Sequence, residues 1–370
     1  MTLLSDLTLI IPTRNRQKYA LRCMRFWSDF PVAVHVLDGS DNPIADESLS
    51  LVHGNVTYHH LPISITERLQ RGAALIETGF ALLGIDDEFY VPSSLASCVR
   101  ELSLNPDLVS CIGRCLRFQV LPQGVVAWPA YTEMANYTVS QSDGIERMIF
   151  HMNPYRVSSL YSVMRSAPWK RIVGLLAARR FQDAATSELQ FELAAAYMGK
   201  SKVISELMWL RSTENAPTWN SPNEQPFHEW WGNEEQQSQR VALVELTAAH
   251  LAPNGNGSTP ALKSAIESAF DVYVQGSLGT KRNRSRTLVV RVLLQVASRW
   301  LPDSVKTRLK RAFARSAILR PLSDLTTKGL FEAAAELQRT GVVVDHAQLK
   351  LIENSIWSSH KAYARAPAIV

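Results

Sequence analysis

Three short apolar runs in the first ninety residues each lead into a polar cluster. The runs are Leu7–Ile11, Val32–Leu37 and Phe80–Ile85, and the clusters that follow them are Thr13–Arg16, Asp38–Ser40 and Asp86–Glu88. Such runs, stopping at turn residues, are typical of buried parallel strands. The segments between them carry apolar residues at helical spacing, so the pattern predicts an α/β fold with a mostly parallel sheet flanked by helices. Because the carboxyl ends of parallel strands share one edge, the three clusters should line one crevice.

The pattern changes further along the chain. We expect a long strand over 108–120, a helix over 187–198, a short strand over 202–204 and a loop over 215–235. The segment 253–258 is rich in Pro, Asn and Gly and predicts a turn-rich linker. We therefore expect two parts, an α/β domain over 1–250 and a helical C-terminal region over 251–370.

The C-terminal region contains a strongly basic segment, Lys281–Arg320. It holds twelve Lys and Arg residues and one acid, Asp303, although the whole chain has a net charge of only +5. Its apolar and basic residues fall on separate faces of two helical stretches. This pattern predicts a surface that lies on anionic lipid, or a helix pair that packs on the protein with its charges in water. Nucleic acid is not expected, because no recognition motif accompanies the charge.

Features of secretion and of membrane spans are not found in the sequence. The four cysteines are Cys23, Cys98, Cys111 and Cys115. They have no zinc-type spacing, and we expect them to be reduced and mostly buried. The first residues do not form a secretory signal, and no run of about 18 apolar residues is present. We therefore expect a cytoplasmic protein, peripheral on the inner face of the cytoplasmic membrane if the basic segment binds lipid.

Asp86, Asp87 and Glu88 place three carboxylates in succession at a predicted strand end. Neighbouring carboxylates repel one another unless a cation or a proton offsets their charge. Oxygen ligands of this kind suit Mn²⁺ or Mg²⁺ bound to a nucleotide diphosphate. The alternative is an ordinary solvated acidic turn. The buried strand before the cluster and the two other polar strand ends favour the metal and nucleotide role.

The three strand ends also resemble a known family. Ile10–Arg16, Val36–Ser40 and Ile85–Phe89 are similar, in order and spacing, to the nucleotide-binding motifs of family 2 glycosyltransferases with the GT-A (Rossmann-like) fold. The likeness covers about residues 7–215 and is greatest to a bacterial surface-polysaccharide subgroup with a DDDF-type signature.

The resemblance implies a role for each matching position. The implied nucleotide-sugar-binding residues are Pro12, Thr13, Arg14, Arg16, Asp38, Asp86 and Asp87. Asp38 would accept a hydrogen bond from the base, and Asp86 and Glu88 would be the metal ligands. Glu88 departs from the family pattern, which has Asp at this position, so the coordination geometry would differ.

Sugar transfer with inversion needs a base that removes the proton of the acceptor hydroxyl. In the family this base is an acid at the start of a helix, about eleven residues before a glycine. Counting back from Gly199 gives Glu188. The acidic pair of the family is incomplete here, because Ser187 precedes Glu188, so Asp183 and Glu192 remain rival candidates.

Departure of a nucleoside diphosphate requires positive charge near its phosphates. Arg211, which follows the apolar run Leu207–Leu210, and Arg71, in a predicted helix, are candidates for this role. Either could instead be an ordinary surface cation.

The sequence thus predicts a metal-dependent glycosyltransferase that uses a nucleoside-diphosphate sugar. The acceptor would be a saccharide or a lipid-linked saccharide, in the synthesis of a bacterial cell-surface polysaccharide such as lipopolysaccharide. The resemblance implies inversion at the anomeric carbon. The alternative is a non-catalytic, membrane-associated adaptor that retains a degenerate nucleotide-binding fold. The oligomeric state stays open, with a homodimer as one option.

Overall fold

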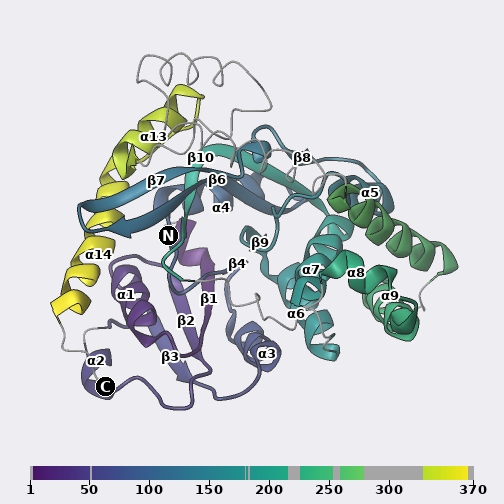
Figure 1. Cartoon of the computed structure of the whole chain (residues 1–370), viewed down its shortest axis with the longest axis horizontal. Coiled ribbons are helices and arrows are strands. Elements are labelled where there is room, and N and C mark those ends of the chain that lie inside the picture. The colour runs from purple at the N-terminus through teal and green to yellow at the C-terminus, as the bar shows by residue number, and fades with distance from the viewer. Residues whose placement is uncertain are drawn as a thin grey trace, which may run out of the picture.

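A computed structural model of the protein describes residues 3–50, 52–179, 181, 184–215, 226–252, 259–278 and 328–365. Their strands join in one sheet, and helices lie on its faces (Figure 1). The predicted α/β class is confirmed. The core is continuous, because side chains from the sheet and from the covering helices belong to one cluster of buried apolar residues.

The sheet is parallel in its N-terminal part and mixed beyond it. Its strands are β1 (Leu7–Thr13), β2 (Ala33–Asp38), β3 (Val56–His60), β4 (Phe80–Leu83), β5 (Phe89–Tyr90), β6 (Leu108–Leu121), β7 (Gly124–Ala130), β8 (Thr138–Val139), β9 (Val163–Arg165), β10 (Lys200–Ser212) and β11 (Lys328–Gly329). Their order is β11-β7-β6-β9-β4-β1-β2-β3, and β10 pairs with β5, β6 and β8. Strands β4, β1, β2 and β3 are mutually parallel, as predicted, whereas β9 is antiparallel to both of its neighbours.

Helices cover the sheet and extend beyond it. They are α1 (Gln17–Trp27), α2 (Asp46–Leu49), α3 (Ile65–Leu75), α4 (Pro92–Leu104), α5 (Gly144–Met152), α6 (Ser166–Ala178), α7 (Ala184–Met198), α8 (Phe227–Gly232), α9 (Gln237–Leu251), α13 (Leu330–Arg339) and α14 (His346–Arg365), with a further helix over 260–278. Helix α3 begins after a capping box, in which Ser64 and Glu67 satisfy each other's backbone N–H groups. The helix therefore begins at Ile65, directly after this cap.

Two sequence-based expectations were wrong in extent. Strand β10 spans 13 residues instead of the three expected over 202–204, because it pairs with β6 along most of its length. The expected loop over 215–235 contains helix α8, whose Phe227, Trp230 and Trp231 are buried. Burial of these large aromatic side chains outweighs the loop-like composition of the segment.

Residues 328–365 of the C-terminal region pack on the sheet. Strand β11 pairs with β7, and α13 and α14 lie beside β6 and β7 (Figure 1). Helix α14 also contacts α1. The boundary at 250/251 remains a prediction, and the basic segment 281–320 lies outside the described residues.

Two further expectations concern cysteines and membrane spans. All four cysteines are free and buried, as predicted. Among the described residues, no helix combines the length and the apolar character that crossing a bilayer requires.

Candidate active site

The three polar clusters of the sequence lie at one edge of the sheet. In the parallel pair of β1 and β2, Thr13 is the register partner of Asp38. On the other side of β1, Ile10 is the partner of Leu83, so β4 ends beside β1 and delivers Asp86 to the same edge. The predicted meeting of the three strand ends is therefore confirmed.

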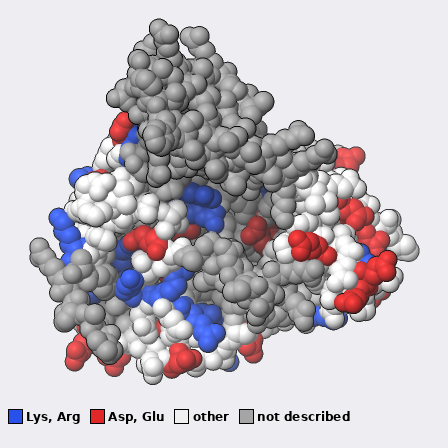
Figure 2. Space-filling view, viewed as in Figure 1, with Lys and Arg blue, Asp and Glu red and all other residues white. Residues whose placement is uncertain are grey.

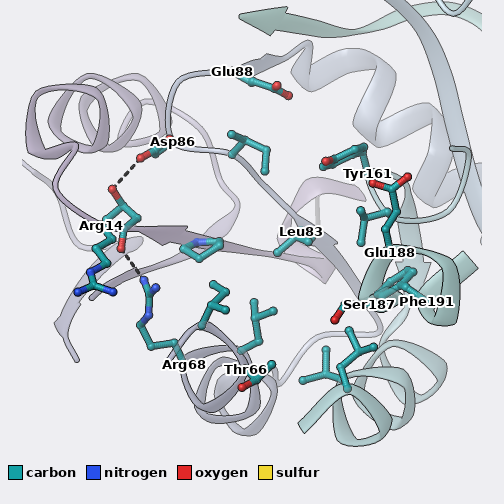
Figure 3. A pocket seen from close by; sticks show the side chains of 18 of the residues that line it. Arg14, Thr66, Arg68, Leu83, Asp86, Glu88, Tyr161, Ser187, Glu188 and Phe191 are labelled. Atoms are coloured by element: carbon teal, nitrogen blue, oxygen red, sulfur yellow. Dashed lines mark hydrogen bonds between the residues drawn. The ribbon is translucent and has the colours of Figure 1, made fainter. Parts of the chain in front are cut away.

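A cavity of about 590 Å³ opens at this edge. Nine of the predicted residues line it, namely Pro12, Thr13, Arg14, Arg16, Asp86, Asp87, Glu88, Glu188 and Arg211. Figure 3 shows Glu188 and Tyr161 across the cavity from Asp86 and Arg14. Four predicted residues are not among the lining ones. They are Asp38, Arg71 and Glu192, which the structure describes, and Asp183, which lies outside the described residues.

Asp86 and Asp87 share the cation of Arg16. The Arg16 Nη2 atom lies 3.2 Å from Asp86 Oδ1 and also contacts Asp87 Oδ2. Thr13 Oγ1 donates a hydrogen bond of 2.7 Å to Asp86 Oδ2. Burial raises the pKa of Asp86 to about 6, although Arg16 opposes the rise. In this structure an arginine therefore provides the charge compensation that the sequence assigned to a metal.

Glu88 is held by a different part of the sheet. Trp209 of β10 donates its indole N–H to Glu88 Oε2, and Arg211 Nε lies 3.8 Å from Oε1. Burial, with the charge of Asp87, raises the pKa of Glu88 to about 8. In Figure 3 the side chains of Asp86 and Glu88 point to different sides of the strand end.

The raised pKa of Glu88 predicts a pH-dependent stability. A carboxyl group with a pKa of about 8 in the folded protein, against 4.5 ordinarily, stabilises the fold fully below its unfolded pKa. This contribution is lost as the pH rises through the folded pKa. In metal-free buffer, the free energy of unfolding of the wild type should fall between about pH 5 and pH 8, by up to roughly 1.4 kcal/mol per unit more than that of Glu88→Gln. Urea titrations at several pH values measure this difference, and equal slopes would contradict the assignment.

The residues fit a metal ion only in part. The described residues include no group of three or more His, Cys, Asp or Glu side chains placed to hold one. Asp86 Oδ1, however, is buried and accepts no hydrogen bond from the described residues, although Arg16 Nη2 lies 3.2 Å away. Mg²⁺ and Mn²⁺ bound to nucleotides often use one or two carboxylates together with substrate phosphates and water. Asp86 suits such a ligand, whereas Glu88 is engaged by Trp209, and its role as a metal ligand stays a prediction.

Glu188 lies in the wall of the cavity formed by α7. Its side chain is half-buried, and Tyr155 Oη donates a hydrogen bond of 2.6 Å to Oε1. The described residues donate no hydrogen bond to its Oε2. Burial raises the pKa of Glu188, and the nearby charge of Glu192 acts in the same direction. A carboxylate with a raised pKa and a free oxygen facing a cavity has the properties of a general base.

Glu192, the rival candidate one turn further along α7, has surroundings typical of a residue that stabilises the fold. It is completely buried and does not line the cavity. Its carboxylate accepts hydrogen bonds from the backbone N–H groups of Ser159 and Leu160 and from His151 Nε2. The geometry therefore favours Glu188 over Glu192 as the base.

Both carboxylate oxygens of Asp38 already accept hydrogen bonds from neighbouring residues. Oδ1 accepts hydrogen bonds from the backbone N–H and the hydroxyl of Ser40, and Oδ2 accepts one from Tyr58. The side chain is fully buried. The structure therefore gives Asp38 the task of shaping the β2 end, and its hydrogen bond to a base stays a prediction.

Sequence reasoning missed Arg68, which lines the cavity in place of Arg71. Its Nη1 donates to the carbonyl oxygens of Thr13 and Leu37, at the ends of β1 and β2. Arg71, one turn later, is exposed. The sequence feature that indicates this placement is Gly72, where an added Cβ would lie 2.8 Å from Leu37 Cδ1. This close approach brings α3 onto the sheet and Arg68 under the strand ends.

The opposite half of the cavity is apolar, which the sequence did not reveal. Its walls come from the end of β4, from α3, α6 and α7, and from the segments before β9 and after α6. The apolar lining residues are Ile65, Leu69, Leu83, Leu160, Trp169, Val173, Leu176, Phe181 and Phe191. The cavity thus joins a charged end at the strand termini to an apolar end between helices, a combination typical of small-molecule sites.

Comparison with known proteins gives a distant structural likeness. No protein-family model matches the chain, and no curated protein matches it in sequence. Among solved structures, S. aureus TarS 1–349 in complex with UDP-GlcNAc is 14% identical, with a TM-score of 0.42 over 75% of this chain and 91% of that chain. The complex of S. aureus TarS 1–349 with UDP is 15% identical, with a TM-score of 0.40 over the same shares of the two chains.

Proposed function

We propose that this protein is a glycosyltransferase that moves a sugar from a nucleoside-diphosphate sugar to a saccharide or lipid-linked saccharide. One observation carries the proposal: a single cavity joins the charged strand ends, with Arg16, Asp86 and Arg211, to the half-buried carboxylate of Glu188. This arrangement offers cations for a leaving diphosphate at one end and a base for an acceptor hydroxyl at the other.

At the charged end, the chain's own groups bind and orient the donor. Arg16 and Arg211 would meet the diphosphate, since a guanidinium can form paired hydrogen bonds to phosphate oxygens. Asp86, positioned by Thr13, would face the ribose or the metal. A divalent cation held by Asp86 would add positive charge beside the departing diphosphate.

At the other end, Glu188 would take the proton of the attacking hydroxyl. Tyr155 holds one carboxylate oxygen, so the other is oriented, and none of the described residues donates a hydrogen bond to it. The bond from the anomeric carbon to the acceptor oxygen forms as the bond to the diphosphate breaks. This single displacement gives inversion of configuration.

Nucleotide binding provides the first test. In calorimetric titrations of UDP and GDP with and without Mn²⁺, we expect one of the two to bind more tightly with the metal. Asp86→Asn should weaken that binding by roughly tenfold to hundredfold, because a charged ligand is lost. Glu88→Ala tests whether the second acid also contributes.

Asp29→Asn is the matched control, since Asp29 is exposed and lies outside the cavity. Its affinity for nucleotide should equal that of the wild type. If neither nucleotide binds under any condition, the enzymatic proposal fails and the adaptor alternative gains support.

We also propose that the basic segment 281–320 places the protein on an anionic membrane surface, near a lipid-linked acceptor. The proposal rests on its twelve Lys and Arg residues and their amphipathic spacing. The full chain should co-sediment with vesicles that contain phosphatidylglycerol and not with pure phosphatidylcholine vesicles. Equal recovery with both would refute this role.

A further inference from the structure

Two arginines, of which one lines the cavity, lie side by side on neighbouring strands. Arg117 of β6 and Arg211 of β10 are register partners in a parallel strand pair. The central guanidinium carbons of Arg117 and Arg211 lie 5.7 and 5.5 Å from the centre of the Tyr131 ring. Like charges placed opposite each other in a sheet repel. Figure 2 shows Lys and Arg atoms gathered in the middle of one face of the molecule.

The described residues compensate this charge poorly. Arg211 has one carboxylate partner among the described residues, Glu88, at a distance of 3.8 Å between Nε and Oε1. Arg117 forms no ion pair or hydrogen bond with the residues that the structure describes, and its Nε is buried without a partner. A buried donor without a partner destabilises the fold. An oxyanion between the two guanidinium groups would relieve both costs.

The aromatic residue that both arginines contact has an unusual backbone. Tyr131, just after β7, has φ 50° and ψ 43°, in the left-handed region. Bulky residues rarely adopt this conformation, and where they do so it is often at binding sites. Its ring stacks on Trp209, with centroids 5.3 Å apart and planes 12° from parallel. Trp209 in turn holds Glu88, so this cluster is continuous with the active site.

We propose that Arg117, Arg211 and Tyr131 form a subsite for an oxyanion, a phosphate or carboxylate group carried by the acceptor. The inference rests on the proposed function and adds the substrate class, an acidic acceptor. Arg117 and Tyr131 do not line the cavity that contains Arg16 and Asp86, whereas Arg211 does. The subsite therefore borders the cavity from the β6 side and shares Arg211 with the donor site, where this arginine would also face the diphosphate.

Inorganic phosphate is the probe for this subsite. It is titrated by calorimetry into the full-length protein saturated with the nucleotide that binds best. Arg117→Ala should weaken phosphate binding at least about tenfold, because a charge-assisted contact is removed. Arg117→Lys keeps the charge but loses the planar guanidinium, and its affinity for phosphate should lie between those of the wild type and Arg117→Ala. Arg100→Ala, an exposed residue of α4, is the matched control and should bind like the wild type.

The outcomes separate the two sources of the anion. If phosphate binds the nucleotide-saturated protein and Arg117→Ala loses it, the acceptor subsite is supported. If phosphate binds only without nucleotide, the arginines hold the donor diphosphate and the proposal is overturned. Unchanged phosphate affinity in Arg117→Ala, or in Arg117→Lys should the alanine variant fail to fold, also overturns it. If no nucleotide binds, the proposed function fails, and the same titration of the free protein still decides whether the anion site exists.

Discussion

Glu188→Gln should lower the rate of sugar transfer by about 10²- to 10⁴-fold, the usual contribution of a general base. The amide keeps the size of the side chain and an oxygen that can accept the hydrogen bond from Tyr155. It cannot take the proton of the acceptor hydroxyl. Because Glu188 lies across the cavity from the charged strand ends, nucleotide affinity should stay unchanged (Figure 3). Transfer assays with the best donor, together with nucleotide titrations, measure both quantities.

Glu267→Gln is the matched control, since Glu267 is exposed on the helix over 260–278. It should retain full transfer and full nucleotide binding. Normal transfer by Glu188→Gln would rule out Glu188 as the base and make Asp183 the next candidate. Loss of both transfer and nucleotide binding would instead show that Glu188 shapes the donor site.

The charged end of the site could be predicted from sequence because its residues follow strands directly. Thr13 and Asp86 stand at the ends of neighbouring parallel strands, and parallel pairing alone brings them together. The same local logic places Asp38 at this edge. It does not show that Ser40 and Tyr58 occupy both of its carboxylate oxygens.

Contacts between distant segments could not be predicted. Trp209 meets Glu88 because β10 runs back beside β5 and β6, and a sequence of short strands does not specify this path. The place of the antiparallel strand β9 between β4 and β6 likewise depends on pairing between distant segments. Arg68 depends on how closely α3 approaches β2 at Gly72, which is decided by packing.

The hydrogen bonds around Glu192 are another contact between distant segments. They hold the loop whose Tyr155 donates a hydrogen bond to Glu188, the candidate base. Tyr137 Oη lies 2.7 Å from His151 Nδ1, and His151 Nε2 lies 2.9 Å from Glu192 Oε2. A glutamate carboxylate accepts, so Nε2 donates, and in a neutral imidazole Nδ1 then accepts a hydrogen bond from the Tyr137 hydroxyl. Glu192 also binds the backbone N–H groups of Ser159 and Leu160. The same loop carries Tyr155, which contacts Glu188.

Glu192→Ala should destabilise the protein by about 3–5 kcal/mol, because two backbone N–H groups and His151 lose their buried acceptor. Transfer should also fall, since the loop that positions Tyr155 on Glu188 is released. Glu192→Gln should lose less than half as much stability, because its carbonyl oxygen still serves the backbone while His151 can change tautomer. Urea unfolding of the full chain measures these changes.

Glu267→Ala, at an exposed position, is the control, and its free energy of unfolding should stay within about 0.5 kcal/mol of the wild type. The transfer rate of Glu192→Gln, compared with that of Glu188→Gln, separates a positioning role from a catalytic one. If Glu192 acts through the loop, Glu192→Gln keeps most of the transfer that Glu188→Gln loses. Equal loss of transfer in Glu192→Gln and Glu188→Gln, with Glu192→Gln fully stable, would make Glu192 a participant in proton transfer and contradict the positioning role.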